Sequence, residues 1–178
     1  TDIRNAEVAV GIAGESFSVP DLRMNSVSIM HNTVASVAAR HADLSAVNSL
    51  FAHSGFSTIS INDGGHYEFI HCTVSNRWEY GFRSEPALLI NPTSGTMPAV
   101  SVVNSVISGS LANEIVIKGS ASLAASGFRA DSSLIKVDTL SSAWYSSPLF
   151  RHVITSSAPR FIDESLWDFR PDTLSPLL

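Results

Sequence analysis

The sequence predicts an all-β chain that folds as a parallel solenoid, with short strands of successive repeats stacked on one another. Three observations lead to this prediction. Only 15% of the 178 residues are charged, whereas serine, valine and isoleucine are plentiful, which favours strands over charged amphipathic helices. A short segment centred on asparagine recurs along the chain. A segment with alternating apolar residues then follows the asparagine at a constant offset.

The recurring segment is a short apolar stretch, a polar residue, a small residue and another apolar stretch. Aligned copies lie 20 to 33 residues apart, which is the repeat length of a solenoid coil. The aligned polar positions are Asn5, Asn25, Asn48, His71, Asn104 and Ser132. The following positions are Ala6, Ser26, Ser49, Cys72, Ser105 and Ser133. We therefore expect a tight turn that recurs once in each coil.

The alternating segments give the second strand of the coil. Ile59 and Ile61 follow Asn48 by 11 and 13 residues, and Ile115 and Ile117 follow Asn104 by the same offsets. Alternation with a period of two is the pattern of a strand with one buried face. The sequence therefore predicts strands over 57–61 and 113–117.

The asparagines are predicted to form a ladder. We expect Asn25, Asn48, His71 and Asn104 to stack in successive coils and to point into the interior of the turn, where their amides satisfy turn backbone groups. Leucine-rich repeats share this period, but Asp43 and Ser45 stand where that motif needs leucines. An antiparallel sandwich explains alternating strands but does not predict an aligned asparagine.

The chain is predicted to be a single domain, residues 1–178, with two insertions and a terminal cap. The longer repeat spacing places one insertion at about 83–98, and an irregular stretch places another at about 136–160. The proline-punctuated segment of about 159–178 is expected to cap the C-terminal end. Because the first repeat begins almost at Thr1, we expect upstream coils or another chain to cover the N-terminal edge.

Composition disfavours several function classes. The net charge is −5 with 11 Lys and Arg, so a nucleic-acid-binding stripe is not expected. No apolar run is long enough to span a membrane. The single cysteine, Cys72, excludes a disulfide framework, and its place beside the aligned turn suggests a buried small residue. The six histidines lack metal-ligand spacing, so no metal site is predicted, although His31 and His53 are expected to stack on the surface.

The catalytic candidates are few. The sequence around Asp63 and His66 brings together an acid, two glycines and a histidine, but Asp-Gly-Gly is first of all a turn signal. Glycosidases need two carboxylates about 10 Å apart or less, and lyases need a base, usually beside Ca²⁺ held by clustered acids. Neither pattern is evident, so no cofactor is expected, and Ca²⁺ is considered only for a lyase.

The segment 77–83 is the best candidate for a binding surface. Arg77, Trp78, Tyr80 and Arg83 alternate large rings with charges, a composition suited to stacking on sugar faces and bonding their hydroxyls or carboxylates. The alternative is that the rings cover the flank of the solenoid. A second, weaker candidate is the pair Trp144 and Tyr145.

The Asn-Ser rungs, the stretch 67–74 and the tail 161–176 resemble right-handed parallel β-helix proteins, in particular the pectate-lyase-like proteins secreted by Bacteroidetes-type bacteria. The resemblance implies a right-handed parallel β-helix of about six coils. It also implies an extracytoplasmic place, either secreted or at the outer-membrane surface, where many such proteins are lipoproteins. The fold hosts lyases, hydrolases, adhesins and scaffolds, so it does not fix the function.

We therefore expect a non-catalytic binding or scaffold module whose ligand is a glycan or a partner protein. The alternative is a carbohydrate-active enzyme, a polysaccharide lyase or a glycosidase. A cluster of acidic and basic side chains on one exposed sheet face would favour the enzyme, and its absence would favour the scaffold.

Overall fold

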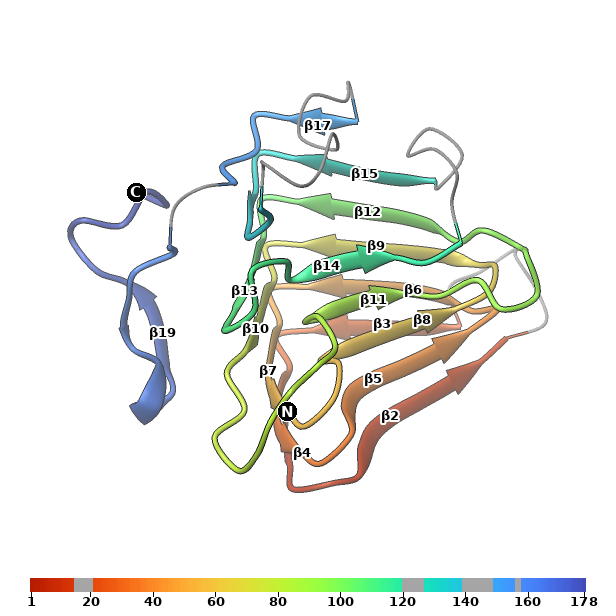
Figure 1. The fold of residues 1–178 in the computed structure, drawn as a ribbon, viewed down its shortest axis with the longest axis horizontal. Coiled ribbons are helices and arrows are strands. Elements are labelled where there is room, and N and C mark those ends of the chain that lie inside the picture. Colours follow the sequence, from red (N-terminus) through yellow and green to blue (C-terminus); the bar gives the residue numbers. More distant parts are fainter. Residues whose placement is uncertain (15–20, 120–126, 139–148, 156–157) are drawn as a thin grey trace.

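The computed structural model describes residues 1–14, 21–119, 127–138, 149–155 and 158–178. Within these ranges every regular element is a β-strand apart from one short 3-10 helix. The strands form three parallel sheets, here called A, B and C, and one antiparallel hairpin (Figure 1). In this part of the chain no helix is both long and apolar enough to cross a membrane.

The sheets are described here in the order in which their strands pair. Sheet A contains β1 (Asp2–Arg4), β4 (Ser28–Asn32), β7 (Leu50–Ser54), β10 (Thr73–Asn76), β13 (Val106–Gly109) and β16 (Leu134–Ile135). Sheet B contains β2 (Val8–Ala13), β5 (Ala35–Arg40), β8 (Ile59–Asn62), β11 (Leu88–Ile90) and β14 (Ile115–Ile117). Sheet C contains β3 (Leu22–Asn25), β6 (Asp43–Val47), β9 (His66–Ile70), β12 (Ala99–Val103), β15 (Phe128–Asp131) and β17 (Phe150–Arg151). The hairpin contains β18 (Phe161–Asp163), the 3-10 helix η3 (Glu164–Leu166) and β19 (Asp168–Pro171).

The chain visits the three sheets in turn. β1, β2 and β3 lie in sheets A, B and C, and β4 returns to sheet A beside β1. The same order repeats as far as β15, and every pairing within the three sheets is parallel. This arrangement is consistent with a parallel β-helix and confirms the predicted all-β class. β8 and β14 also coincide with the two predicted alternating segments.

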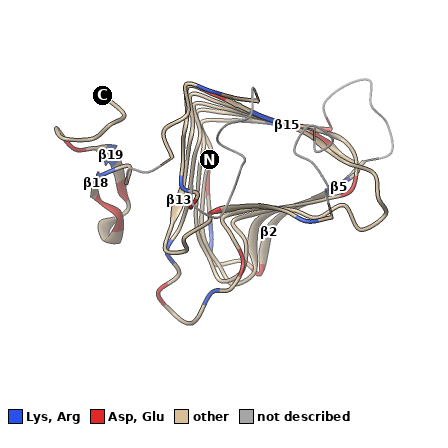
Figure 2. Cartoon of the chain, turned by 45° about the horizontal axis from the view of Figure 1, so that its top comes forward, with Lys and Arg blue, Asp and Glu red and all other residues tan. Residues whose placement is uncertain are grey.

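The interior is built from columns of apolar residues in register. In sheet A, Ile29, Phe51, Val74 and Ile107 occupy one column, and each is buried. Sheets B and C supply similar columns, such as Val37, Ile59, Leu88 and Ile115, or Leu44, Tyr67, Val100 and Phe128. Burying one such side chain contributes about 1.5–3 kcal/mol. Figure 2 shows that the three sheets enclose a single interior, where these columns pack together.

The predicted interior asparagine ladder is wrong. Asn48, His71 and Asn104 do occupy equivalent positions in successive coils, but their side chains are exposed. Their φ angles are 50°, 53° and 47°, in the left-handed region that asparagine tolerates better than most residues. Asn25 is also exposed and pairs in register with Val47, so Ser26, with φ 54°, takes the turn position in that coil.

The small residues after these turns form the interior column instead. The Oγ of Ser105 accepts a hydrogen bond from the backbone N–H of Cys72 at 2.9 Å, and Ser105 donates its own N–H to Ser133 Oγ at 3.1 Å. Buried asparagines occur in the turn between sheets A and B. There Asn32 and Asn76 accept from the backbone N–H groups of Ala6 and Ser54.

The structure revises two of the three irregular segments that the sequence predicts, the insertion at 83–98 and the cap at 159–178. β11 divides the segment 83–98, because Leu88–Ile90 pairs with both β8 and β14. Much of the segment 136–160 lies outside the described residues. The segment 159–178 forms the hairpin, which lies beside the stack next to β13 rather than across its end (Figures 1 and 2).

Candidate functional site

Asp63, a catalytic candidate, is a structural residue. It lies at the end of sheet B with φ 55° and is fully buried. Its carboxylate accepts hydrogen bonds from the Thr93 hydroxyl at 2.7 Å and from the Ser94 N–H, and it faces Arg40 Nε at 3.4 Å. Burial acts to raise the pKa of Asp63, but these hydrogen bonds outweigh it and lower the pKa to about 2. The carboxylate therefore fixes the turn that contains Thr93.

His66, the second catalytic candidate, lies on the outer face of sheet C and pairs with a different acid. Asp43 Oδ1 lies 3.0 Å from His66 Nδ1 and accepts the His66 backbone N–H at 2.9 Å. The backbone of Asp43 is itself held in place, because its N–H donates to Asp21 Oδ2 at 2.9 Å. The imidazole is mostly exposed, at 65%, whereas the Asp43 side chain is 11% exposed. A buried carboxylate thus orients an accessible imidazole.

A second row of polar side chains lies beside this pair. Ser45, Glu68, Ser101 and Arg129 are in register on β6, β9, β12 and β15. The Ser45 hydroxyl donates to Glu68 at 3.4 Å, and Arg129 Nε donates to Ser101 at 3.2 Å. Alternate residues of a strand share a face, so this row and the Asp43–His66 pair line the same surface. Together they line a groove with a volume of about 440 Å³.

The groove contains both signs of charge and a titratable base. Two carboxylates, an imidazole and a guanidinium meet on one exposed face, with two hydroxyls between them. From the strand rise and strand spacing, the Cα atoms of Asp43 and Glu68 are about 8 Å apart. An imidazole held by a carboxylate can exchange a proton with a bound molecule, and the guanidinium can bind a carboxylate. The acid–base cluster that would favour an enzyme is therefore present.

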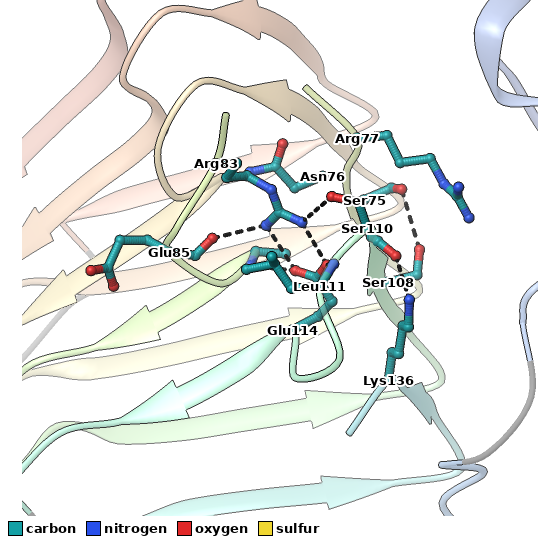
Figure 3. Close-up of polar contacts among 12 residues, drawn as sticks. Ser75, Asn76, Arg77, Arg83, Glu85, Ser108, Ser110, Leu111, Glu114 and Lys136 are labelled. Atoms are coloured by element: carbon teal, nitrogen blue, oxygen red, sulfur yellow. Dashed lines mark hydrogen bonds and ion pairs between the residues drawn. The ribbon is translucent and has the colours of Figure 1, made fainter. Parts of the chain in front are cut away.

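Arg83, a binding candidate, is buried in an ion pair (Figure 3). Its guanidinium donates to both carboxylate oxygens of Glu114, at 2.6 and 2.9 Å, and to the carbonyl of Glu85. Glu114 also accepts the backbone N–H groups of Ala87 and Leu111. The exposed fractions of the Arg83 and Glu114 side chains are 2% and 0%. Arg83 therefore joins two loops and does not present its charge to a ligand.

The rest of the segment 77–83 is exposed. Trp78 is partly exposed and contacts Tyr80 edge-on at 5.2 Å between ring centroids. Tyr80 and Phe82 are 75% and 95% exposed, so the expected exposure of Trp78 and Tyr80 is confirmed. Arg77 pairs with Glu164 of the hairpin, Nε to Oε2, at 2.6 Å. The structure therefore brings together the rings of Trp78 and Tyr80 but not the two arginines.

The other candidate residues have clear places. His31 and His53 stack as predicted, with centroids 5.0 Å apart, but not on the surface, because His53 is buried and His31 is only partly exposed. Cys72 is buried, and this burial raises the pKa of its thiol. Trp144 and Tyr145 lie outside the described residues. Among those that are described, no group of three or more His, Cys, Asp or Glu side chains is arranged to hold a metal ion.

Sequence reasoning missed Asp43, Glu68 and Arg129. A usable signal was present, because Asp43 and Ser45, like His66 and Glu68, are two residues apart on strands that the repeat aligns. Aligning the outer face as well as the turn would have brought these residues together.

Comparisons with protein-family models, with curated proteins and with solved structures found no match to this chain.

Proposed function

We propose that this protein binds a glycan in the groove of sheet C and acts on it by acid–base chemistry, as a polysaccharide lyase or a glycosidase. The observation that carries the proposal is the Asp43–His66 pair, which shares an exposed face with Glu68 and Arg129. This is the alternative function from the sequence, and the acid–base cluster moves it ahead of a purely non-catalytic role.

The shape of the groove fits an extended polymer. The Ser45–Arg129 row crosses four neighbouring strands and so runs for about 14 Å along the stack. Hydroxyls, a carboxylate and a guanidinium along this row match the donors and acceptors of a sugar chain. Arg129 would favour an acidic sugar, because a guanidinium binds a carboxylate through two parallel hydrogen bonds.

Each polar group has a chemical role in this proposal. Asp43 binds the Nδ1 side of the His66 ring, so Nε2 is the nitrogen that exchanges a proton with the glycan. Glu68 supplies a second carboxylate on the same face as Asp43, and a glycosidase needs such a pair. In a lyase, His66 would remove the proton beside a uronate carboxylate that Arg129 neutralises.

The proposal also covers the type of β-helix and the cellular location of the protein. We propose a right-handed parallel β-helix of about six coils, of the pectate-lyase-like secreted type. Six strands in sheets A and C support the coil number, and about 98% of parallel crossovers are right-handed. An extracytoplasmic place, secreted or as a lipoprotein of the outer-membrane surface, accompanies this type.

A non-catalytic module is the second candidate, favoured by the exposed rings of Trp78, Tyr80 and Phe82. Exposed aromatic rings stack on the apolar faces of sugars or anchor a partner protein. In this case the groove residues would not matter for binding, whereas the ring residues would.

One set of variants separates the two candidates. The purified chain is incubated with neutral and uronate-containing polysaccharides, while reducing ends, unsaturated uronate products and binding are measured. We expect His66→Asn to abolish product formation and to retain binding. His152→Asn is the matched control, because His152 forms a similar pair with Asp131, Nδ1 to Oδ1 at 3.2 Å, outside the groove. Binding lost only in Tyr80→Ser or Phe82→Ser, without any product, would support the second candidate instead.

A further inference from the structure

Two stacked histidines lie where the hairpin meets the stack. His31 and His53 are the next-to-last residues of β4 and β7 in sheet A, and their rings are 18° from parallel, with centroids 5.0 Å apart. The hairpin covers them with aromatic rings. Trp167 lies 4.9 Å from His31, and Phe169 lies 5.7 Å from His53. The four rings therefore form the contact between the hairpin and sheet A.

Among the described residues, two further charged side chains hold the hairpin. The guanidinium of Arg4 lies over the Trp167 ring at 4.4 Å, and Arg77 pairs with Glu164 at 2.6 Å. Cavities of about 520 and 410 Å³ lie between the hairpin and the stack, so the rest of the contact is loosely packed. The ring cluster is thus a large share of what keeps the hairpin in place.

The surroundings of the stacked imidazoles disfavour protonation, because a buried nitrogen of each ring has no hydrogen-bond partner among the described residues. His53 Nδ1 lies 2.9 Å from the carbonyl of Arg77 and donates to it, which leaves Nε2 as the other nitrogen. In the described chain, Nε2 of His53 and Nε2 of His31 are buried and lack a hydrogen-bond partner. Because His53 Nδ1 already donates, protonation of His53 would put a buried N–H without an acceptor on Nε2, and protonation of His31 would put a charge on a ring whose buried Nε2 also has no partner.

The charges that face His31 oppose its protonation in sum. Burial is the main cause of a lowered pKa of His31, followed by the neighbouring His53 and by Arg4, while Glu79 acts in the opposite sense. The other charged groups around this contact have partners of their own: Arg77 pairs with Glu164 and Arg160 with Asp172, while Asp163 accepts the backbone N–H groups of Ser165 and Leu166. A cation in the stack would therefore face a second ring, Arg4 and no acceptor.

We propose that the His31–His53 stack is a pH-sensitive latch, which docks the hairpin when both rings are neutral and releases it when they take up protons. Release separates Trp167 and Phe169 from the stack and opens the surface of sheet A beneath them. The latch does not depend on the groove of sheet C or on the function proposed for it.

The direction of the pH effect follows from linkage. Burial lowers the pKa of His31 in the docked state, so this state binds a proton at His31 less well than the released state, where the ring has the ordinary histidine pKa of about 6.5. Docking is therefore strongest above this value and weakens as the pH falls below it. One proton per transition changes the docking constant by up to about tenfold per pH unit.

The test follows Trp167 by fluorescence. Trp78→Phe and Trp144→Phe leave it as the only tryptophan of the three. Between about pH 7.5 and about pH 5, we expect its collisional quenching to rise by up to about twofold, because Trp167 is already 46% exposed when docked, and hydrogen exchange over 158–178 to become faster, with far-UV circular dichroism unchanged. The exchange data are corrected for the intrinsic pH dependence of the amides.

Two substitutions identify the cause. His31→Phe and His53→Phe keep a stacking ring and remove the titrating group, so we expect each to reduce the pH response and the double variant to abolish it. His41→Asn is the control, because it removes a histidine from the turn between sheets B and C, where asparagine tolerates the φ of 48°, and it should leave the response intact. A Trp167 signal that does not change between the two pH values in the parent chain overturns the latch, as does an unchanged response in the folded double variant.

Discussion

The turn between sheets C and A places one residue per coil in the left-handed region. Ser26, Asn48, His71, Asn104, Ser132 and His152 all have φ between 47° and 54°. Their side chains are exposed, so asparagine, serine and histidine are favoured here by the backbone conformation and not by buried side-chain contacts. Short polar side chains tolerate this conformation, whereas β-branched ones clash with the backbone. The repeated asparagine is therefore explained by the left-handed backbone conformation of the turn.

Asn48 tests this explanation. We expect Asn48→Val to lower the free energy of unfolding by about 1–2 kcal/mol, because valine is strained at φ 50°. We expect Asn48→Gly to be nearly neutral, because glycine adopts this φ without strain. Urea denaturation measures both. A large loss in the glycine variant would instead indicate that the amide itself makes essential hydrogen bonds.

At the scale of elements, loops are fastened to the sheets by buried charge. Glu114 precedes β14 and binds Arg83, together with backbone N–H groups on both sides of the contact. Gly109 makes room for it, since a Cβ at that position would collide with the Glu114 carboxylate. The pair thus connects the loop before β11 to the turn before β14.

Removing one partner of this pair should be costly. We expect Glu114→Ala to lower the free energy of unfolding by about 3–5 kcal/mol, because it leaves the Arg83 guanidinium buried without its counter-charge. Glu85→Ala is the control, since Glu85 pairs with the half-exposed Lys118 and should cost less than about 1 kcal/mol. Equal losses in the two variants, measured by urea denaturation, would contradict a structural role for the buried pair.

Prediction from sequence succeeded where the pattern is local and failed for β11 and for most contacts between coils. The strands β8 and β14 follow from their alternating isoleucines, because that pattern is local. β11 was missed, since its three residues lie between prolines in a stretch without alternation. His66 was paired with the nearby Asp63, whereas its partner Asp43 is 23 residues away and meets it only through the stacking of coils.

At the scale of the whole molecule, the stack is tightest in its middle. Val37 and Ile59 are fully buried, whereas Ile3, Val10 and Ile12, in the coil that contains β1 and β2, are only partly buried. Among the described residues, β1, β2 and β3 are the terminal strands of sheets A, B and C, so this coil has a neighbouring coil on one side only and buries its apolar side chains less completely.

The response of the whole fold to acid depends on its buried carboxylate. Because Asp63 has a pKa of about 2 in the folded chain and an ordinary value of 3.8 when unfolded, the unfolded chain takes up its proton first as the pH falls. Its contribution to stability is complete above about pH 4 and is lost towards about pH 2. We expect Asp63→Asn to be less stable at neutral pH and to show a flatter decline of the thermal midpoint over this interval.

Asp168 provides the control, because its pKa is also about 2. Its partner Arg170 is only two residues away, so the pair partly persists in the unfolded chain, and Asp168→Asn should change the decline less. Parallel curves for the parent chain and Asp63→Asn would contradict this assignment.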